Sequence, residues 1–103
     1  MSTLLLEHEP EAASLKVTAD AFIVELSDGR SLSIPWTWYP RLLHGTEAER
    51  QNWRLLGDGY AIEWPDLDEH IGIEGLVAGR RSGESDASLK QWFTNRTRSA
   101  SSL

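Results

Sequence analysis

The sequence predicts an α+β domain: a small antiparallel β-sheet of three to four strands covered by short helices, with a short C-terminal helical tail. Three observations predict this class. Segments in which apolar and polar residues alternate are separated by tight-turn signals, which is typical of antiparallel strands. Short helical signals follow the first strands. The composition then changes from acidic to basic near residue 80, ahead of a separate apolar helical face.

Three strands are expected to form a meander near the N-terminus. Residues 15–19 alternate between apolar and polar side chains and predict the first strand, which a turn joins to a second strand at 21–26. Asp28 and Gly29 follow, and this pair supplies positive φ at low steric cost in tight hairpin turns. Residues 31–34 alternate again, so we expect a third strand that pairs back on the second.

Two short helices are expected next. Pro40 fits the first turn of a helix over 41–44, because proline has no N–H to lose there. Thr46 and Glu49 form a capping box, in which each side chain accepts a hydrogen bond from the other's backbone N–H. This box predicts a second helix that runs to about Trp53.

The second half of the body combines a turn, a strand and a short helix. Residues 57–59 predict a glycine turn, and 60–64 alternate as a strand. The polar loop 66–70 leads to a short strand or turn at 70–72, and a helical turn is expected over 73–78. The expected core is apolar and comes from all of these elements: Val17, Phe22, Val24, Leu26, Leu32, Ile34, Leu42, Leu43, Trp53, Leu55, Ile62, Leu76 and Val77.

Charge divides the chain into a body, residues 1–79, and a linker with a basic tail, residues 80–103. The body has five basic and fourteen acidic residues, a net charge of −9, whereas the tail has five basic and two acidic residues, a net charge of +3. Asp86 is a good N-cap, and the apolar residues 89, 92 and 93 lie on one helical face. A helix of about three turns is marginal alone, so the tail must dock on its own body, on a partner or on something acidic.

Several chemistries are excluded or disfavoured. The chain has no cysteine, which excludes disulfides, thiolate metal sites and a cysteine nucleophile. It has no phosphate-binding loop and no nucleophile-elbow motif. The carboxylates and histidine of 66–70 could ligate a metal, or serve with Glu63 in acid–base catalysis, but we favour a solvated acidic loop. We therefore expect no catalytic residue, no metal and no cofactor, and keep a small enzyme using 63–70 as an alternative.

Four of the five tryptophans lie between residues 36 and 64. Tryptophan is common in cores and enriched at protein interfaces, so we expect core packing together with an interface patch. A base-stacking platform is disfavoured, because a body with net charge −9 repels phosphates. The candidate partner-binding residues are Trp36, Trp38, Tyr39, Trp64, Asp66, Asp68 and Glu69. The candidates for nucleic-acid contact or tail docking are Arg80, Arg81, Lys90, Trp92, Arg96 and Arg98.

The stretch from residue 15 to residue 79 resembles the DUF2442 family of small bacterial proteins. The resemblance rests on these pieces: Val-Glu-Leu-Ser-Asp-Gly-Arg30, Ile-Pro-Trp36, Trp-Tyr-Pro-Arg-Leu-Leu43, Thr46 to Trp53, Gly-Tyr-Ala-Ile-Glu-Trp-Pro-Asp-Leu-Asp-Glu69 and Ile-Glu-Gly-Leu76. It implies a small α+β domain without an established activity, so no catalytic residue is carried over. It also implies a neighbouring gene for another small protein, in an arrangement like a toxin–antitoxin pair. Some longer relatives have a C-terminal helix-turn-helix, for which the chain after Gly79 is too short.

These observations predict a non-enzymatic interaction module, an antitoxin-like partner of another protein, such as a small basic protein encoded nearby. The alternative is a DNA-binding regulator or accessory domain that acts through the basic tail. Homodimerisation is a further expectation, because a small sheet has exposed edges. No apolar run reaches membrane-spanning length and no signal peptide is evident, so we expect no membrane contact and a cytoplasmic location.

Overall fold

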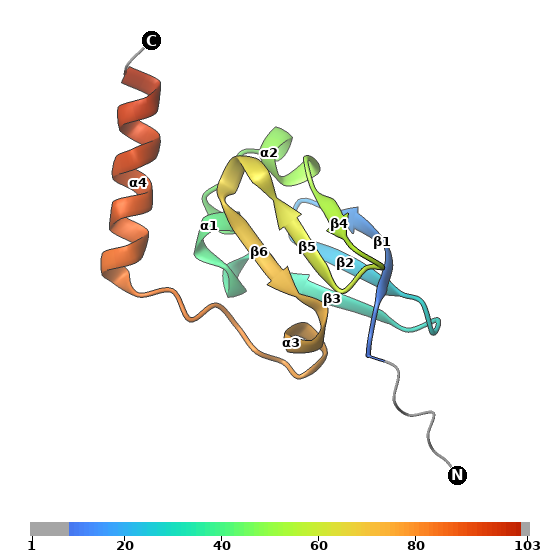
Figure 1. Ribbon diagram of the computed structural model, residues 1–103. Coiled ribbons are helices and arrows are strands. Elements are labelled where there is room, and N and C mark those ends of the chain that lie inside the picture. The colour runs from blue at the N-terminus through green and yellow to red at the C-terminus, as the bar shows by residue number, and fades with distance from the viewer. Residues whose placement is uncertain (1–8, 102–103) are drawn as a thin grey trace.

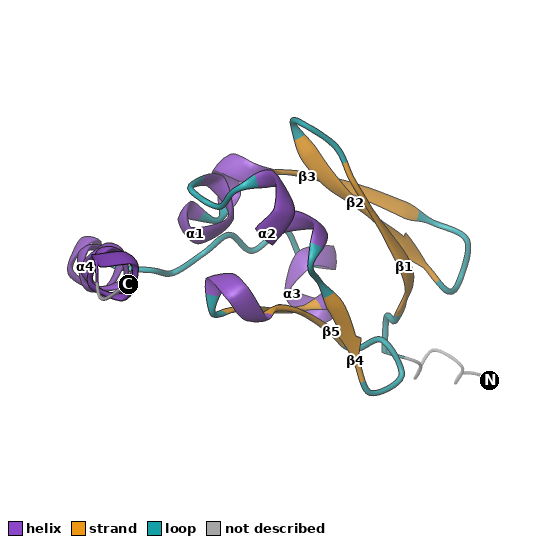
Figure 2. Ribbon diagram, turned by 90° about the horizontal axis from the view of Figure 1, so that it is seen from above, coloured by secondary structure: helices purple, strands orange, loops and turns teal. Residues whose placement is uncertain are grey.

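The computed structural model describes residues 9–101, and side chains as far as Thr97. Within this range, six strands form two three-stranded antiparallel sheets. The first contains β1 (Ala12–Val17), β2 (Ala21–Leu26) and β3 (Ser31–Pro35), and the second contains β4 (Arg54–Leu56), β5 (Ala61–Trp64) and β6 (Glu69–Gly72). The helices are η2 (Trp36–Trp38), α1 (Pro40–Leu43), α2 (Glu47–Gln51), η3 (Pro65–Leu67), α3 (Ile73–Val77) and α4 (Asp86–Ser101). The α+β class is confirmed, and Figures 1 and 2 show the two sheets as separate layers with α4 outside them.

Local turn chemistry explains the strand connections. Between β2 and β3, Gly29 has a φ of +97°, and the N–H of Arg30 donates to the Asp28 carboxylate at 3.0 Å. Gly59 has a φ of +99° in the turn before β5. A Cβ there would collide with the carbonyl oxygen of Ala12, whose own N–H donates to the Gly59 carbonyl at 2.7 Å. This close approach joins the beginning of β1 to the second sheet.

An aromatic cluster fills the core between the sheets. The Phe22 ring lies 5.3 Å from the Trp36 ring, 6.3 Å from Tyr39 and 5.2 Å from Trp64, measured between centroids. Each polar tip finds an acceptor: the Trp36 Nε1–H donates to the Thr18 carbonyl at 3.1 Å, and the Trp64 Nε1–H donates to the Arg50 carbonyl at 2.9 Å. Aromatic burial therefore leaves no indole N–H without a partner in this cluster.

The prediction of core positions is wrong for two residues. Leu43 is 40% exposed and Val77 is 37% exposed. Each is the last residue of a short helix, and the residue before it, Leu42 or Leu76, is the buried one. Adjacent helical positions point about 100° apart, so a helix of one turn does not bury both against one surface. Four other expected core residues lie at its margin and are partly buried: Val17, Leu32, Trp53 and Leu55.

The tail begins as an anchored segment before it becomes a helix. The N–H of Ser82 donates to the Trp38 carbonyl at 3.1 Å, so the beginning of the expected tail is held on the body. The cap of α4 is Ser85, whose hydroxyl accepts from the N–H of Ser88 at 3.1 Å. The expected cap, Asp86, instead stands in the first turn, where its charge favours the helix dipole. No helix in the described part of the chain is long and apolar enough to cross a membrane.

Candidate functional site

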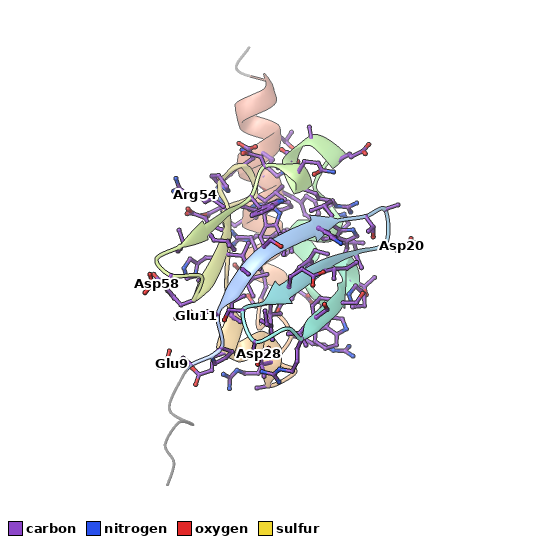
Figure 3. All side chains as sticks on the ribbon, turned by 90° about the vertical axis from the view of Figure 1, so that its right-hand side faces the viewer. Glu9, Glu11, Asp20, Asp28, Arg54 and Asp58 are labelled. Carbon is purple, nitrogen blue, oxygen red and sulfur yellow. The ribbon has the colours of Figure 1, made fainter. Side chains whose placement is uncertain are left out.

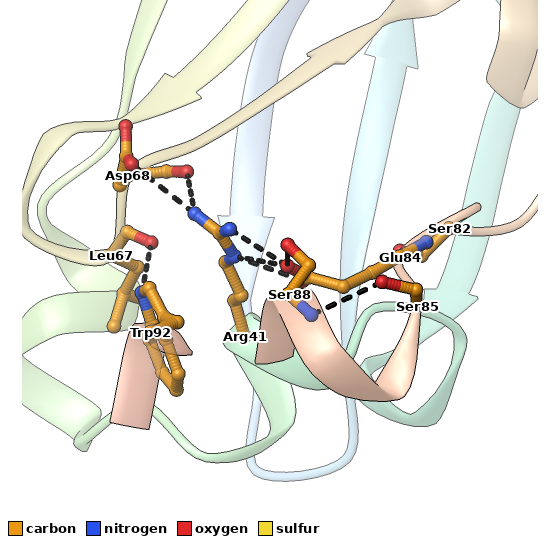
Figure 4. A network of polar contacts seen from close by, with 8 residues as sticks. All are labelled: Arg41, Leu67, Asp68, Ser82, Glu84, Ser85, Ser88 and Trp92. Atoms are coloured by element: carbon orange, nitrogen blue, oxygen red, sulfur yellow. Dashed lines mark hydrogen bonds and ion pairs between the residues drawn. The ribbon is translucent and has the colours of Figure 1, made fainter. Parts of the chain in front are cut away.

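The tail docks on the body through one tryptophan. Trp92 of α4 is 6% exposed, and its Nε1–H donates to the carbonyl of the buried Leu67 at 2.9 Å (Figure 4). The Arg96 guanidinium lies 4.6 Å from the Trp92 ring centroid and gives two hydrogen bonds to the Glu49 carboxylate, at 3.1 and 3.0 Å. The basic tail thus contacts an acidic residue of α2, as expected from the charges of the two segments.

Arg41 of α1 joins three segments that are distant in sequence. Its Nε and Nη2 donate to the Glu84 carboxylate at 2.9 and 2.7 Å, and its Nη1 donates to the Asp68 carbonyl at 2.8 Å (Figure 4). The Asp68 carboxylate lies 3.2 Å from the same Nη1. The Arg41 hydrogen bonds lower the pKa of Glu84, and the Ser88 hydroxyl, which donates at 2.7 Å, lowers it further. We call the set Arg41, Leu67, Asp68, Glu69, Glu84 and Trp92 the tail–body junction.

The pKa of the Glu69 carboxyl group is raised. Burial raises it to about 7 from an ordinary value of 4.5, and the negative charges of Glu84 and Asp68 add to the effect, whereas Arg41 opposes it. The side chain lines an open hollow of about 260 Å³ between β6 and residues 80–83. No ion pair involves Glu69 within residues 9–97, so its burial is not offset by a direct cationic contact.

Three of the expected partner-binding residues are unavailable to a partner. Trp36, Tyr39 and Trp64 are 2%, 6% and 0% exposed, and they belong to the core. That assignment is corrected: the three side chains belong to the core, and the Tyr39 hydroxyl donates to the carbonyl of Arg80, at the start of the linker, at 2.9 Å.

The other four lie at or near the surface, in different places. Trp38 is half-buried beneath the Arg81 guanidinium, which lies 4.5 Å from its ring centroid. Asp66 is exposed and accepts from the Asn52 amide at 2.8 Å. Asp68 and Glu69 belong to the tail–body junction. The seven residues therefore do not form one surface.

The expected tail residues divide between docking and exposure. Trp92 and Arg96 dock on the body, and Arg81 covers Trp38. Arg80 and Lys90 are exposed. The side chain of Arg98 lies outside the described residues.

The carboxylates of the acidic loop and Glu63 do not converge on one site, although Asp68 and Glu69 both belong to the tail–body junction. Glu63 pairs with Arg54, Asp66 accepts from Asn52, and Asp68 contacts Arg41. Within the described residues, no group of three or more histidine, aspartate or glutamate side chains could hold a metal ion.

A second surface was not singled out from the sequence. Glu9, Glu11 and Asp58 lie near one another on the side of the body turned toward the viewer in Figure 3, and form no ion pair with any described residue. A hollow of about 180 Å³ is lined by Glu9, Glu11, the exposed Val77 and the Asp28–Arg30 ion pair, together with Pro10 and Ser27. We call Glu9, Glu11 and Asp58 the acidic face. The net charge of the body was the one signal for it, because Asp58 is distant in sequence from Glu9 and Glu11.

Comparisons with known proteins agree with this fold. Residues 12–82 match the model of a family described as a protein of unknown function, DUF2442. No curated protein matches the chain. A crystal structure of a protein of unknown function from Rhodospirillum rubrum is similar with a TM-score of 0.67 and 27% identity, over 78% of this chain and 96% of that one. A solution structure of an uncharacterised protein from Chromobacterium violaceum has a TM-score of 0.62 and 17% identity, over 71% and 69% of the two chains, and so shows the fold alone.

The matched residues extend from the first strand of the body to the segment that Trp38 anchors, and end before α4. They make up more than half of the chain, and the order of elements within them is the one described above. The chain therefore belongs to the DUF2442 family.

Proposed function

We propose that this chain is a non-enzymatic interaction module that binds a basic surface of a protein partner, in the manner of an antitoxin. The observation that carries the proposal is the acidic face, whose three carboxylates have no cationic partner within the described residues. Unpaired surface charge of one sign steers a partner of opposite sign and selects against others.

The hollow beside the acidic face favours lysine or arginine side chains. Such side chains place their apolar stems on apolar surface while the charged end stays near water. Val77 offers apolar surface at 37% exposure, and the Glu9 and Glu11 carboxylates stand at the same hollow. A basic partner therefore finds both kinds of contact in one place.

The docked tail leaves this surface free. The described ion pairs of the tail go to Glu49 and Arg41, on α2 and α1, and not to the acidic face. The basic tail and the acidic face consequently act as separate parts of the molecule.

The test is co-expression with the product of the adjacent gene, followed by affinity purification. We expect the two proteins to co-purify, and the triple variant Glu9→Gln, Glu11→Gln, Asp58→Asn to bind the partner more weakly and retain less of it. The matched control removes the same charge from exposed positions elsewhere: Asp20→Asn, Glu47→Gln, Asp86→Asn. Failure of the unchanged chain to associate would overturn the pairing, and equal loss in both triple variants would show that net charge, and not this face, is responsible.

The alternative function is DNA binding through the tail, and a separate binding assay on the same protein distinguishes it from binding to a protein partner. Arg96 pairs with Glu49, whereas Arg80, Arg81 and Lys90 are exposed, with the Arg81 guanidinium over the Trp38 ring. A regulator that acts through the tail predicts a salt-sensitive mobility shift of duplex DNA, lost when the tail cations are neutralised. Light scattering of the free chain at two concentrations tests the expected homodimer.

A further inference from the structure

Two carboxylates contact one guanidinium at the tail–body junction, and a third lies near enough to feel its charge. Arg41 gives its hydrogen bonds to Glu84 and to the backbone and side chain of Asp68. Glu69 stands beside them at the hollow under the linker without an ion pair of its own among the residues described. We propose that docking of the tail is proton-linked: residues 80–84 and α4 hold to the body while Glu69 is protonated and loosen when it ionises.

Several different elements supply the charged and titratable groups around Glu69. Tyr39 precedes α1, Arg41 lies in α1, and Asp68 directly follows η3. Glu84 belongs to the segment that precedes α4, and it is this group that leaves when the tail undocks. The charged and titratable groups that face Glu69 or line its hollow are Tyr39, Arg41, Asp68, His70, Arg80, Arg81 and Glu84.

The direction of the linkage follows from what undocking removes. Release of residues 80–84 removes one wall of the hollow, so that Glu69 is better hydrated, and takes the Glu84 charge away; both changes favour the ionised form of Glu69. Arg80 and Arg81 leave with the same segment and oppose this, but the main influences on the pKa of Glu69 are burial and the charges of Arg41, Glu84 and Asp68. An ionised Glu69 therefore favours the released tail, and a protonated one favours the docked tail. The pKa of Glu69 is about 7 in the docked state. Docking of the tail is therefore strongest below about pH 4.5 and weakens as pH rises from there through neutrality.

The size of the effect has an upper limit. If release returned the pKa of Glu69 from about 7 to its ordinary 4.5, the docking equilibrium would change by about 300-fold over the full titration. Tyr39, Arg41 and Asp68 stay beside Glu69 after release, so part of the difference remains. We expect a change of about tenfold, which corresponds to one pKa unit.

The experiment follows the distance between the helix and the body. The chain has no cysteine, so donor and acceptor dyes attach selectively to Ala48→Cys in α2 and Ala87→Cys in α4, both exposed positions. Energy transfer is measured at pH 5.5, 7.0 and 8.5 in the full chain. Two further variants carry the same labels: Glu69→Gln, and the control Glu74→Gln, which removes an exposed carboxylate of α3.

We expect transfer to fall with rising pH in the labelled chain and in the Glu74→Gln control, and to stay high and constant in Glu69→Gln. Transfer that is independent of pH in the labelled chain would overturn the proposal, whether or not the glutamine variant folds. The same pH response in a folded Glu69→Gln chain would also overturn it, because another group would then be responsible.

Discussion

Replacing Trp92 with alanine is expected to release α4 while the body stays folded. A tryptophan buries about 150–250 Å², which at about 25 cal/mol per Å² is worth roughly 4–6 kcal/mol of transfer free energy. Trp92 is 6% exposed, so nearly all of that area is removed from water. Loss of its hydrogen bond to the Leu67 carbonyl costs about 1 kcal/mol more. An isolated helix of this length is marginal. We therefore expect a loss of this size to exceed the free energy that favours the docked helix over the released one.

Amide hydrogen exchange measures the release segment by segment. In Trp92→Ala we expect the amides of α4 to exchange at least about a hundredfold faster, because a change of 2.7 kcal/mol or so already gives that factor, while the amides of β5 keep their protection. The control is Phe93→Ala in the same helix, since Phe93 is already 38% exposed and contacts the His44 ring at 4.8 Å. Protected α4 amides in Trp92→Ala would refute the reasoning, and equal loss in β5 would show that the helix and body unfold as one unit.

The other predictions concern the capping box, the glycine turn and the acid response. Thr46→Ala removes the hydroxyl that accepts from the Glu49 N–H at 3.1 Å, and urea unfolding should show a loss of about 1 kcal/mol. Gly59→Ala should cost more than about 2 kcal/mol in the same assay, because positive φ and a collision with the backbone of β1 act together; Gly29→Ala, with positive φ but no atom nearby, should cost about 1 kcal/mol. Arginine contacts lower the pKa of both Glu49 and Glu84. Their contribution to docking is present above the ordinary range of glutamate and is lost as pH falls through the lowered pKa, so α4 amides should lose protection in acid before those of β5.

Elements formed by neighbouring residues could be predicted from the sequence. The hairpin at Gly29 and the capping box of Thr46 and Glu49 are both present, because their hydrogen bonds join residues two to four apart. Strand β4 was not predicted. It has three residues, and its existence depends on pairing with β5 across the glycine turn, a contact that its own short pattern does not indicate. The division of the strands into two sheets is equally a property of the whole fold.

The site was harder to predict, because tryptophan satisfies the same pattern in a core and at an interface. Trp36 and Trp64 each donate to a backbone carbonyl fourteen or more residues away, and no local signal distinguishes that from contact with a partner. Docking of the tail on the body was one of three expectations left open. The partner of Trp92 is the carbonyl of Leu67, 25 residues distant. Every residue has a backbone carbonyl, so the sequence does not indicate which one accepts this hydrogen bond.

The acidic face could not be predicted from the sequence for a related reason. Total charge placed the body at −9, but Glu11 and Asp58 come together only because the N–H of Ala12 donates to Gly59. Charge that is summed along a chain does not show which carboxylates lie without a cation beside them.

The most direct test of the proposed interaction is the salt dependence of binding between this chain and the product of the adjacent gene. If unpaired carboxylates of the acidic face hold a basic surface, affinity should fall steadily as salt rises from about 50 to 500 mM, since exposed charges are screened within about 10 Å at 0.1 M. The fall should be smaller for the chain carrying Glu9→Gln, Glu11→Gln and Asp58→Asn than for the control triple variant. Affinity that is indifferent to salt, or the same fall in both variants, would contradict the account.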